Sequence, residues 1–291
     1  MNWTGKVKAL WGMVLAFPAF GFLCLFKVVP IVVACLASFS DYPTTRGFKG
    51  FVGVDNYRYL FADPIFMSSL KVTLFFVTSL TLAQIVLAFL LAVILQEKCR
   101  ANVAYRLIFF LPYAVSLSIA SIIWWMIYAE WGLANGILAA LKLPRQPFLS
   151  SVGWAPWAIV LMLVWKGVGY WTMVFIAGLN NIPVSLYEAS TVDGANALQR
   201  FFYITIPLLK RVIAFVAVSD TTINFLTFAP VYVMTNGGPR NATNLLAFYA
   251  YRSAFTYNDM GYASAISVVL VLLTAVVVGA EFRLLRTTVT Y

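Results

Sequence analysis

The amino-acid sequence predicts an all-α membrane protein with six transmembrane helices. The chain has 291 residues, of which 62% are hydrophobic and 10% are charged, and its mean hydropathy is +0.88. A soluble domain carries about 25% charged residues. The apolar runs are long enough to cross a bilayer and alternate with short polar segments. We therefore expect a single transmembrane domain over residues 1–291.

The predicted spans cover residues about 10–39, 69–95, 107–128, 154–179, 207–234 and 261–282. The first run is too long for a signal-peptide core of about 7–15 residues. Residues 41–68 are polar and rich in Gly and Pro, which indicates a loop with one short surface helix. Trp124, Trp125 and Tyr128 near the end of the third span are typical of an interfacial belt. The turn at 236–239 ends the fifth span.

Catalysis by this chain is not expected. It has no His, the commonest general base and metal ligand. Cys24, Cys35 and Cys99 lie in or beside apolar runs at no metal-ligand spacing, so neither a metal site nor a disulfide framework is predicted. No Gly-rich phosphate loop is present, which indicates that the chain does not hydrolyse ATP. The net charge of +10 is scattered at membrane edges and does not indicate nucleic-acid binding.

The polar stretch at about 180–207, between the fourth and fifth spans, predicts two short helices bent at a glycine. Ser185 and Glu188 have the S-x-x-E spacing of a capping box, which favours a helix over about 185–193. Gly194 then permits a left-handed cap. A second helix follows through Arg200 until Pro207 interrupts it.

The same stretch resembles the EAA loop, the cytoplasmic coupling element of membrane subunits in ATP-driven importers of the ABC class. Two residues differ mildly from the usual pattern: Ser190 replaces an alanine and Ile206 a leucine. The resemblance implies that the ATPase is contacted by Glu188, Ala189, Ser190, Asp193, Gly194, Ile204 and Pro207.

Charged groups inside the spans predict a second site. Lys166 and Asp220 each lie 13 residues from the loop end of their span, which is roughly 20 Å along a helix. Buried charges at that depth pair with one another or line a wet cavity. A structural Lys166–Asp220 ion pair is one interpretation. A polar substrate site is the other, because Asp220, Asn224 and Thr227 share one helical stripe.

On the fourth span Leu163, Gly167 and Tyr170 repeat this spacing. Tyr170 could pack on a sugar ring, and Gly167 leaves room for a ligand or for close helix packing. Residues 165–239 also resemble the sugar-contacting segment of maltose importer membrane subunits, although Asp220 and Thr227 differ in type. The resemblance implies a substrate site formed by Leu163, Gly167, Tyr170, Asp220, Ile223, Asn224 and Thr227.

Over nearly its whole length the chain resembles the six-helix sugar and glycerol-phosphate permeases of this group. The resemblance implies a permease subunit in a bacterial cytoplasmic (inner) membrane, with both termini in the cytoplasm. It also implies a second homologous permease, two ATPase subunits that hold ATP and Mg²⁺, an external solute-binding protein, and a sugar or sugar derivative as substrate.

Three alternatives stay open at this point. Asp220 could carry protons in an ion-coupled secondary transporter. The chain could be a membrane scaffold in which Lys166 and Asp220 form a structural pair. Within the importer interpretation, Lys166 released from Asp220 could attract an anionic sugar.

Overall fold

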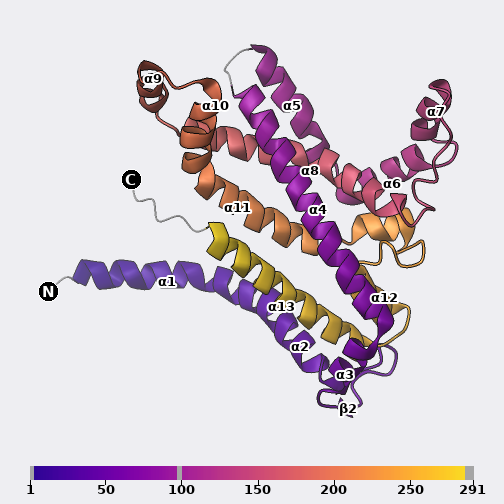
Figure 1. Cartoon of the computed structure of the whole chain (residues 1–291). Helices are drawn as coiled ribbons and strands as arrows, with labels where there is room; N and C mark the ends of the chain where they lie inside the picture. The colour runs from indigo at the N-terminus through magenta and orange to yellow at the C-terminus, as the bar shows by residue number, and fades with distance from the viewer. Residues whose placement is uncertain (1–2, 97–99, 286–291) are drawn as a thin grey trace. The chain divides into compact units, whose positions relative to one another are not determined.

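The computed structural model describes residues 3–96 and 100–285, without the side chains of residues 3–10, 12, 100 and 101. Helices dominate the described residues (Figure 1). The chain divides into two compact units: residues 1–63 with 250–269, and residues 64–249 with 270–291. The organisation of residues 1–291 as one transmembrane domain stays a prediction.

The first unit begins with α1 (Trp3–Leu23), the π-helical turn η1 (Cys24–Val28) and α2 (Val29–Ala37). It continues with β1 (Ser40–Asp41), β2 (Gly50–Phe51) and α3 (Asp55–Ala62). The two strands pair antiparallel, with Ser40 opposite Phe51. The unit also contains the end of α12 (Leu246–Phe255) and the first part of α13 (Met260–Leu285).

Hydrogen bonds attach the loop at 41–54 to the start of α13, where the N–H groups of Met260 and Gly261 donate to the Tyr42 carbonyl at 2.9 and 3.2 Å. Asn56 Nδ2 donates to the carbonyls of Ser38 and Ser40 at 2.9 and 3.0 Å. A Cβ atom at Gly261 would lie 2.2 Å from the Ser40 carbonyl oxygen, so only glycine fits there. Tyr262 closes the connection by donating to Asp63 at 2.8 Å.

The second unit contains the remaining helices. In chain order they are α4 (Pro64–Leu95), α5 (Arg100–Ala114), α6 (Leu117–Tyr128), α7 (Leu133–Ala140), α8 (Trp154–Asn180), α9 (Val184–Val192), α10 (Ala197–Arg200), η2 (Phe201–Thr205), α11 (Ile206–Phe225) and η3 (Val231–Thr235).

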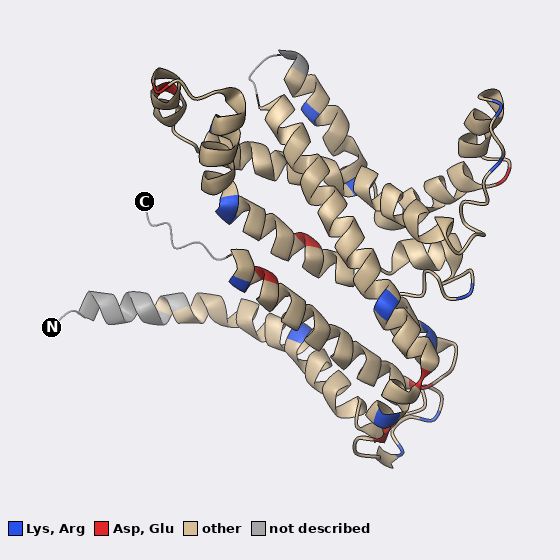
Figure 2. Cartoon of the chain, in the orientation of Figure 1, with Lys and Arg blue, Asp and Glu red and all other residues tan. Residues whose placement is uncertain are grey.

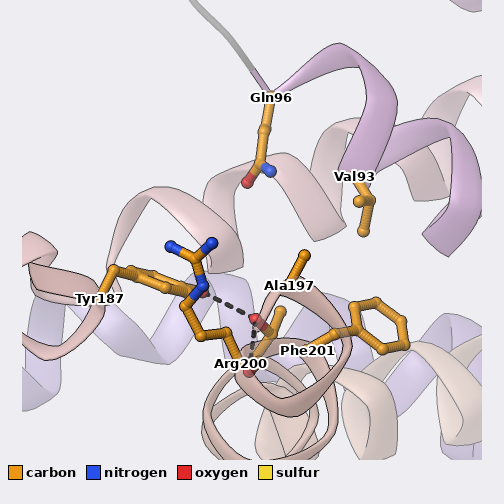
Figure 3. A pocket seen from close by; sticks show the side chains of 7 residues that line it. Val93, Gln96, Tyr187, Ala197, Arg200 and Phe201 are labelled. Carbon is orange, nitrogen blue, oxygen red and sulfur yellow. Dashed lines mark hydrogen bonds between the residues drawn. The ribbon is translucent and has the colours of Figure 1, made fainter. Parts of the chain in front are cut away.

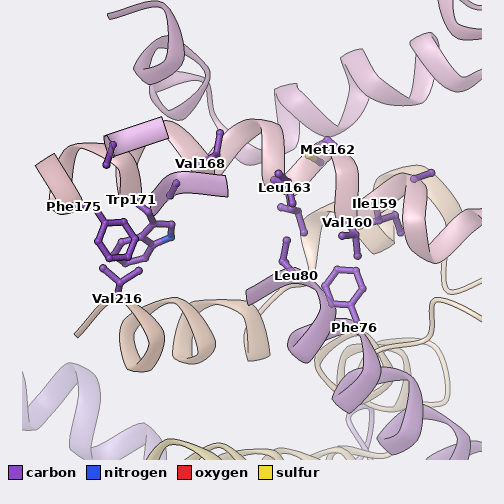
Figure 4. Close-up of a cluster of buried hydrophobic side chains, with 14 of the residues drawn as sticks. Phe76, Leu80, Ile159, Val160, Met162, Leu163, Val168, Trp171, Phe175 and Val216 are labelled. Atoms are coloured by element: carbon purple, nitrogen blue, oxygen red, sulfur yellow. The ribbon is translucent and has the colours of Figure 1, made fainter. Parts of the chain in front are cut away.

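Buried apolar side chains from α4, α8 and α11 form the core of the second unit (Figure 4). Phe76 of α4 and Phe175 of α8 are almost completely buried, as is Val216 of α11. Two glycines let α8 approach its neighbours closely. A Cβ at Gly169 would lie 1.9 Å from the carbonyl oxygen of Phe109 in α5, and one at Gly178 would lie 2.8 Å from a Val212 methyl in α11.

Six segments of the described residues are long and apolar enough to cross a membrane, which confirms the number of predicted spans. They are Met13–Ala37, Pro64–Leu95, Leu117–Ala140, Trp154–Asn180, Ala197–Phe225 and Met260–Leu285. Lys and Arg, like Asp and Glu, lie mostly in loops and near helix ends (Figure 2). Cys24 and Cys35 are free thiols, and Cys99 lies outside the described residues.

Two spans predicted as continuous helices are interrupted. The helix predicted over 107–128 breaks between α5 and α6, where Ser116 is extended and its hydroxyl accepts from Ile119 N–H at 3.3 Å. The helix predicted over 207–234 ends at Phe225. Pro230 explains the second break, because a proline in a continuing helix has no N–H to donate and clashes with the carbonyl four residues earlier.

Candidate functional site

A cavity of about 310 Å³ lies between α4, α5, α6, α8 and α11 of the second unit. All seven residues predicted to contact a substrate line it. Its full lining is Gln84, Tyr113, Leu117, Leu163, Lys166, Gly167, Tyr170, Trp171, Asp220, Ile223, Asn224, Leu226 and Thr227. The structure therefore brings the predicted stripe on α8 together with Asp220, Ile223 and Asn224 of α11 and with Thr227, which lies just after the end of α11. Contact of these residues with a substrate stays a prediction.

A buried hydrogen-bond network crosses this cavity. Trp171 Nε1 donates to one oxygen of Asp220 at 2.7 Å, and Asn224 Nδ2 lies 3.0 Å from the other. The same amide nitrogen of Asn224 lies 2.9 Å from Thr81 Oγ1 and 3.3 Å from Gln84 Oε1. Asp220 and Asn224 are only 2% and 5% exposed. Both side chains are thus oriented by protein partners before any ligand binds.

Gly167 does not leave room for a ligand. A Cβ there would lie 2.1 Å from Gln84 Nε2, so the amide of Gln84 fills the space beside the glycine. This amide donates to the Leu163 carbonyl of α8 at 2.9 Å. The close-packing interpretation of Gly167 is the one that the structure supports.

Lys166 and Asp220 do not form the ion pair that was considered from the sequence. Lys166 Nζ instead donates to the carbonyls of Pro112, Tyr113 and Val115, at 3.5, 3.1 and 2.5 Å. These carbonyls lie at the break between α5 and α6, where the last turn of a helix leaves acceptors without intrahelical partners. The break, which the sequence did not predict, supplies Lys166 with partners of its own.

Aromatic rings form one wall of the cavity. The ring of Tyr113 stacks on that of Tyr170, with centroids 4.5 Å apart and an interplanar angle of 14°. Trp171 meets the Tyr170 ring edge-on at 4.8 Å. A sugar ring could therefore stack on Tyr170 from the Tyr113 side only if Tyr113 moved.

The predicted coupling loop consists of α9, a turn and α10, and its contact with an ATPase stays a prediction. Gly194 has a φ of +78°, as predicted for a left-handed cap. Ala195 N–H donates to the Ser190 carbonyl at 2.9 Å and Gly194 N–H to the Thr191 carbonyl at 3.1 Å. This pair of bonds is a Schellman motif, which ends a helix in a fixed direction.

The loop exposes most of the residues predicted to contact the ATPase. Glu188, Ala189, Asp193, Gly194 and Pro207 are exposed, and Ile204 is half-buried. Ser190 is buried, and its hydroxyl donates to the Tyr187 carbonyl at 2.8 Å. Position 190 therefore requires a small side chain, a requirement that both serine and alanine meet.

Two local predictions for this loop are wrong. Ser185 does not cap α9, because the helix starts one residue earlier and Pro183 takes the N-cap position. The capping box of the loop is formed instead by Asn196 and Gln199 at the start of α10. Pro207 does not interrupt the second helix either. The π-helical turn η2 precedes it, and Pro207 lies in the first turn of α11, where no N–H is needed.

A second cavity, of about 350 Å³, lies at the base of the coupling loop (Figure 3). The Tyr187 hydroxyl of α9 and Thr205 Oγ1 of η2 lie 2.9 Å apart beside it and link the two ends of the loop. Arg200 reaches back to Thr191 Oγ1 at 3.2 Å. These contacts hold α9 and α10 to each other.

Sequence reasoning missed several lining residues of the first cavity. Gln84 carries a recognisable signal, because it is the one amide in the predicted span 69–95. Trp171 follows Tyr170 directly in the sequence. The sequence does not show, however, which group accepts the hydrogen bond of its indole N–H. Tyr113 reaches the cavity only because α5 ends beside it.

Comparison with known proteins identifies the family. The family profile described as "Binding-protein-dependent transport system inner membrane component" matches residues 84–287. The chain is 35% identical over 268 residues to the probable ABC transporter permease protein YesP of Bacillus subtilis, covering 90% of this chain and 86% of YesP. It is 33% identical over 288 residues to the sulfoquinovosyl glycerol transport system permease protein SmoG of Agrobacterium fabrum, covering 98% and 94% of the two chains.

A further relative is the sn-glycerol-3-phosphate transport system permease protein UgpA of Escherichia coli O157:H7, with 34% identity over 243 residues that cover 83% of this chain and 82% of UgpA. The fold is similar to that of a chain in the crystal structure of a bacterial alginate ABC transporter, with a TM-score of 0.85, 22% identity and coverage of 99% and 100%. The chain is a multi-pass membrane protein and belongs to the family of binding-protein-dependent transport system inner membrane components.

Proposed function

We propose that this chain is the permease subunit of an ATP-driven, binding-protein-dependent importer that moves a sugar or sugar derivative into the cytoplasm. The chain forms part of the transport path, and a separate ATPase subunit holds ATP and Mg²⁺ and hydrolyses the nucleotide. Both termini and the α9–α10 loop face the cytoplasm. Glu188 and Gly194 define the surface that meets the ATPase.

One observation carries this proposal: the coupling loop and the cavity are built on the same two helices. Asn180, the last residue of α8, lies four residues before the start of α9, and α10 leads through η2 directly into α11. Tyr170 on α8 and Asp220 on α11 line the cavity. A displacement of the loop by the ATPase would therefore move two cavity walls together, since helices transmit rigid-body motion.

The cavity has the chemistry of a carbohydrate site. It combines a carboxylate, amides and a threonine hydroxyl with three aromatic side chains, Tyr113, Tyr170 and Trp171. Polar groups of these kinds exchange hydrogen bonds with sugar hydroxyls, and aromatic faces pack against the apolar faces of sugar rings. The relatives SmoG and UgpA are named for the transport of sulfoquinovosyl glycerol and sn-glycerol-3-phosphate, which supports a sugar- or polyol-related cargo for the family but not the charge of the cargo of this chain.

Transport would proceed by alternating access. A solute-binding protein delivers the substrate outside, and the cavity lies between this chain and a second, homologous permease. ATP binding closes two ATPase subunits, brings the two coupling loops together and opens the cavity outward. Hydrolysis returns it to the inward-open state.

Copurification tests the proposal directly. The full chain would be solubilised in mild detergent and isolated as the wild type and as the double variant Glu188→Ala, Gly194→Ala. The wild type should bring down an ATPase and a second permease, and the variant should lose the ATPase while keeping the permease. A wild-type chain that purifies alone in every mild detergent would contradict the proposal.

A further inference from the structure

The cavity between α8 and α11 contains two charged residues, Lys166 and Asp220. A ligand with a carboxylate, phosphate or sulfonate group is held in a low-dielectric site by a cation or by free N–H donors. Whether this cavity can bind an anion therefore depends on whether the ammonium group of Lys166 is free to contact a ligand.

The ammonium group of Lys166 is fully engaged. It has three N–H donors, and three carbonyl oxygens lie within 3.5 Å of Nζ. An anionic ligand would have to withdraw this ammonium from the carbonyls of Pro112, Tyr113 and Val115. The carbonyls of Tyr113 and Val115 would then lose the donor that Lys166 provides at the end of α5, which is unfavourable inside a membrane.

Asp220 has no cation partner among the described residues. Its two oxygens accept from Trp171, Asn224 and Thr81, which are all uncharged donors. In its ionised form Asp220 would disfavour a second negative charge in the same cavity by about 5- to 30-fold, taking a separation of about 8 Å and an effective dielectric constant of about 20–40. The carboxylate thus opposes the binding of an anion that Lys166 is not free to attract.

We propose that this cavity accepts uncharged carbohydrates or polyols and excludes anionic ones, and that Asp220 is the residue that sets this selectivity. This inference rests on the proposed function of the cavity as the substrate site. It replaces the hypothesis that Lys166 attracts an anionic sugar.

Asp220 has capacity left for an uncharged ligand. A carboxylate offers about four acceptor positions, and donors from Trp171, Asn224 and Thr81 occupy three of them here. A sugar hydroxyl can donate to the remaining position without bringing a charge into the cavity. Tyr170, which also lines the cavity, offers a hydroxyl and an aromatic edge to the same ligand.

Thiol modification tests this selectivity without knowledge of the natural substrate. Leu226 lines the cavity and is 64% exposed, so Leu226→Cys provides a reporter in a full chain whose native cysteines are replaced by alanine. The probes are three methanethiosulfonates of similar size: the neutral hydroxyethyl, the anionic sulfonatoethyl and the cationic trimethylammonioethyl reagents. Each rate is divided by the rate of the same reagent with a small thiol in solution. Val192→Cys, on the coupling loop and 89% exposed, is the matched control outside the cavity.

At Leu226→Cys the anionic reagent should react about 5- to 30-fold more slowly than the neutral one, and the cationic reagent should react at least as fast as the neutral one. Asp220→Asn should remove most of this difference at Leu226→Cys and leave Val192→Cys unchanged. Equal rates for the neutral and anionic reagents in the chain that retains Asp220 would overturn the inference, and this comparison does not require the Asp220 variant to fold. Failure of all three reagents at Leu226→Cys would instead contradict a water-filled cavity and the proposed function with it.

Discussion

Gly194 offers the sharpest test of the coupling loop. Its φ of +78° lies in the left-handed region, and a Cβ added there would meet no atom within 4 Å. The cost of Gly194→Ala is therefore purely conformational, about 1–2 kcal/mol for a left-handed non-glycine residue. Asn adopts this conformation more readily, which makes Gly194→Asn the matched control.

The strain would reduce the population of loops in the conformation that the ATPase recognises. A cost of 1–2 kcal/mol corresponds to about a 5- to 30-fold loss of apparent affinity, since about 1.4 kcal/mol is a factor of ten. The assay is binding of the copurified ATPase to the chain in lipid nanodiscs, measured by titration for the wild type and both variants. We expect Ala to weaken binding within this range and Asn to weaken it much less. Equal affinities for the wild type and Gly194→Ala would refute the role of the Schellman turn.

Three further substitutions test the interior, each read out by thermal unfolding in detergent. Gly169→Ala places a Cβ 1.9 Å from a backbone oxygen of α5 and should lower the Tm clearly, whereas Gly136→Ala, which meets no atom within 4 Å, should leave the Tm nearly unchanged. Trp171→Phe removes a donor to the buried Asp220 and should cost about 1–3 kcal/mol of unfolding free energy; an unchanged Tm would argue against that bond. Lys166→Met should lower the Tm, because the carbonyls of Tyr113 and Val115 lose their donor; a loss of uptake confined to anionic ligands would instead show that Lys166 binds them.

Much of the fold follows from the sequence because hydropathy alone specifies membrane spans. The breaks after α5 and α11 were missed because the flanking residues are as apolar as the helices themselves. Pro230 carried a signal for the second break, since a proline within a helical run ends or kinks it. Ser116 was a weaker signal, because serine also occurs within membrane helices.

The sequence predicted which residues line the candidate site better than it predicted the hydrogen-bond partners of those residues. The stripe of Asp220, Asn224 and Thr227 could be deduced from helical spacing, and the structure places all three at one cavity. The partners of Lys166 could not be deduced, because depth along a helix does not give the direction of a side chain. Gln84 reaches the cavity from α4 and donates to the Leu163 carbonyl of α8. The packing of α4 against α8 is a tertiary contact, which the local sequence pattern does not predict.

ATP-driven uptake into proteoliposomes tests the central claim most directly. The copurified complex would be reconstituted with ATP and Mg²⁺ on the side of the coupling loop, and uptake of labelled ligand supplied with the solute-binding protein would be followed. We predict uptake that requires ATP and the binding protein and that persists when an uncoupler collapses the proton gradient. Uptake that continues without ATP and stops with the uncoupler would contradict the account and favour a proton-coupled transporter that uses Asp220.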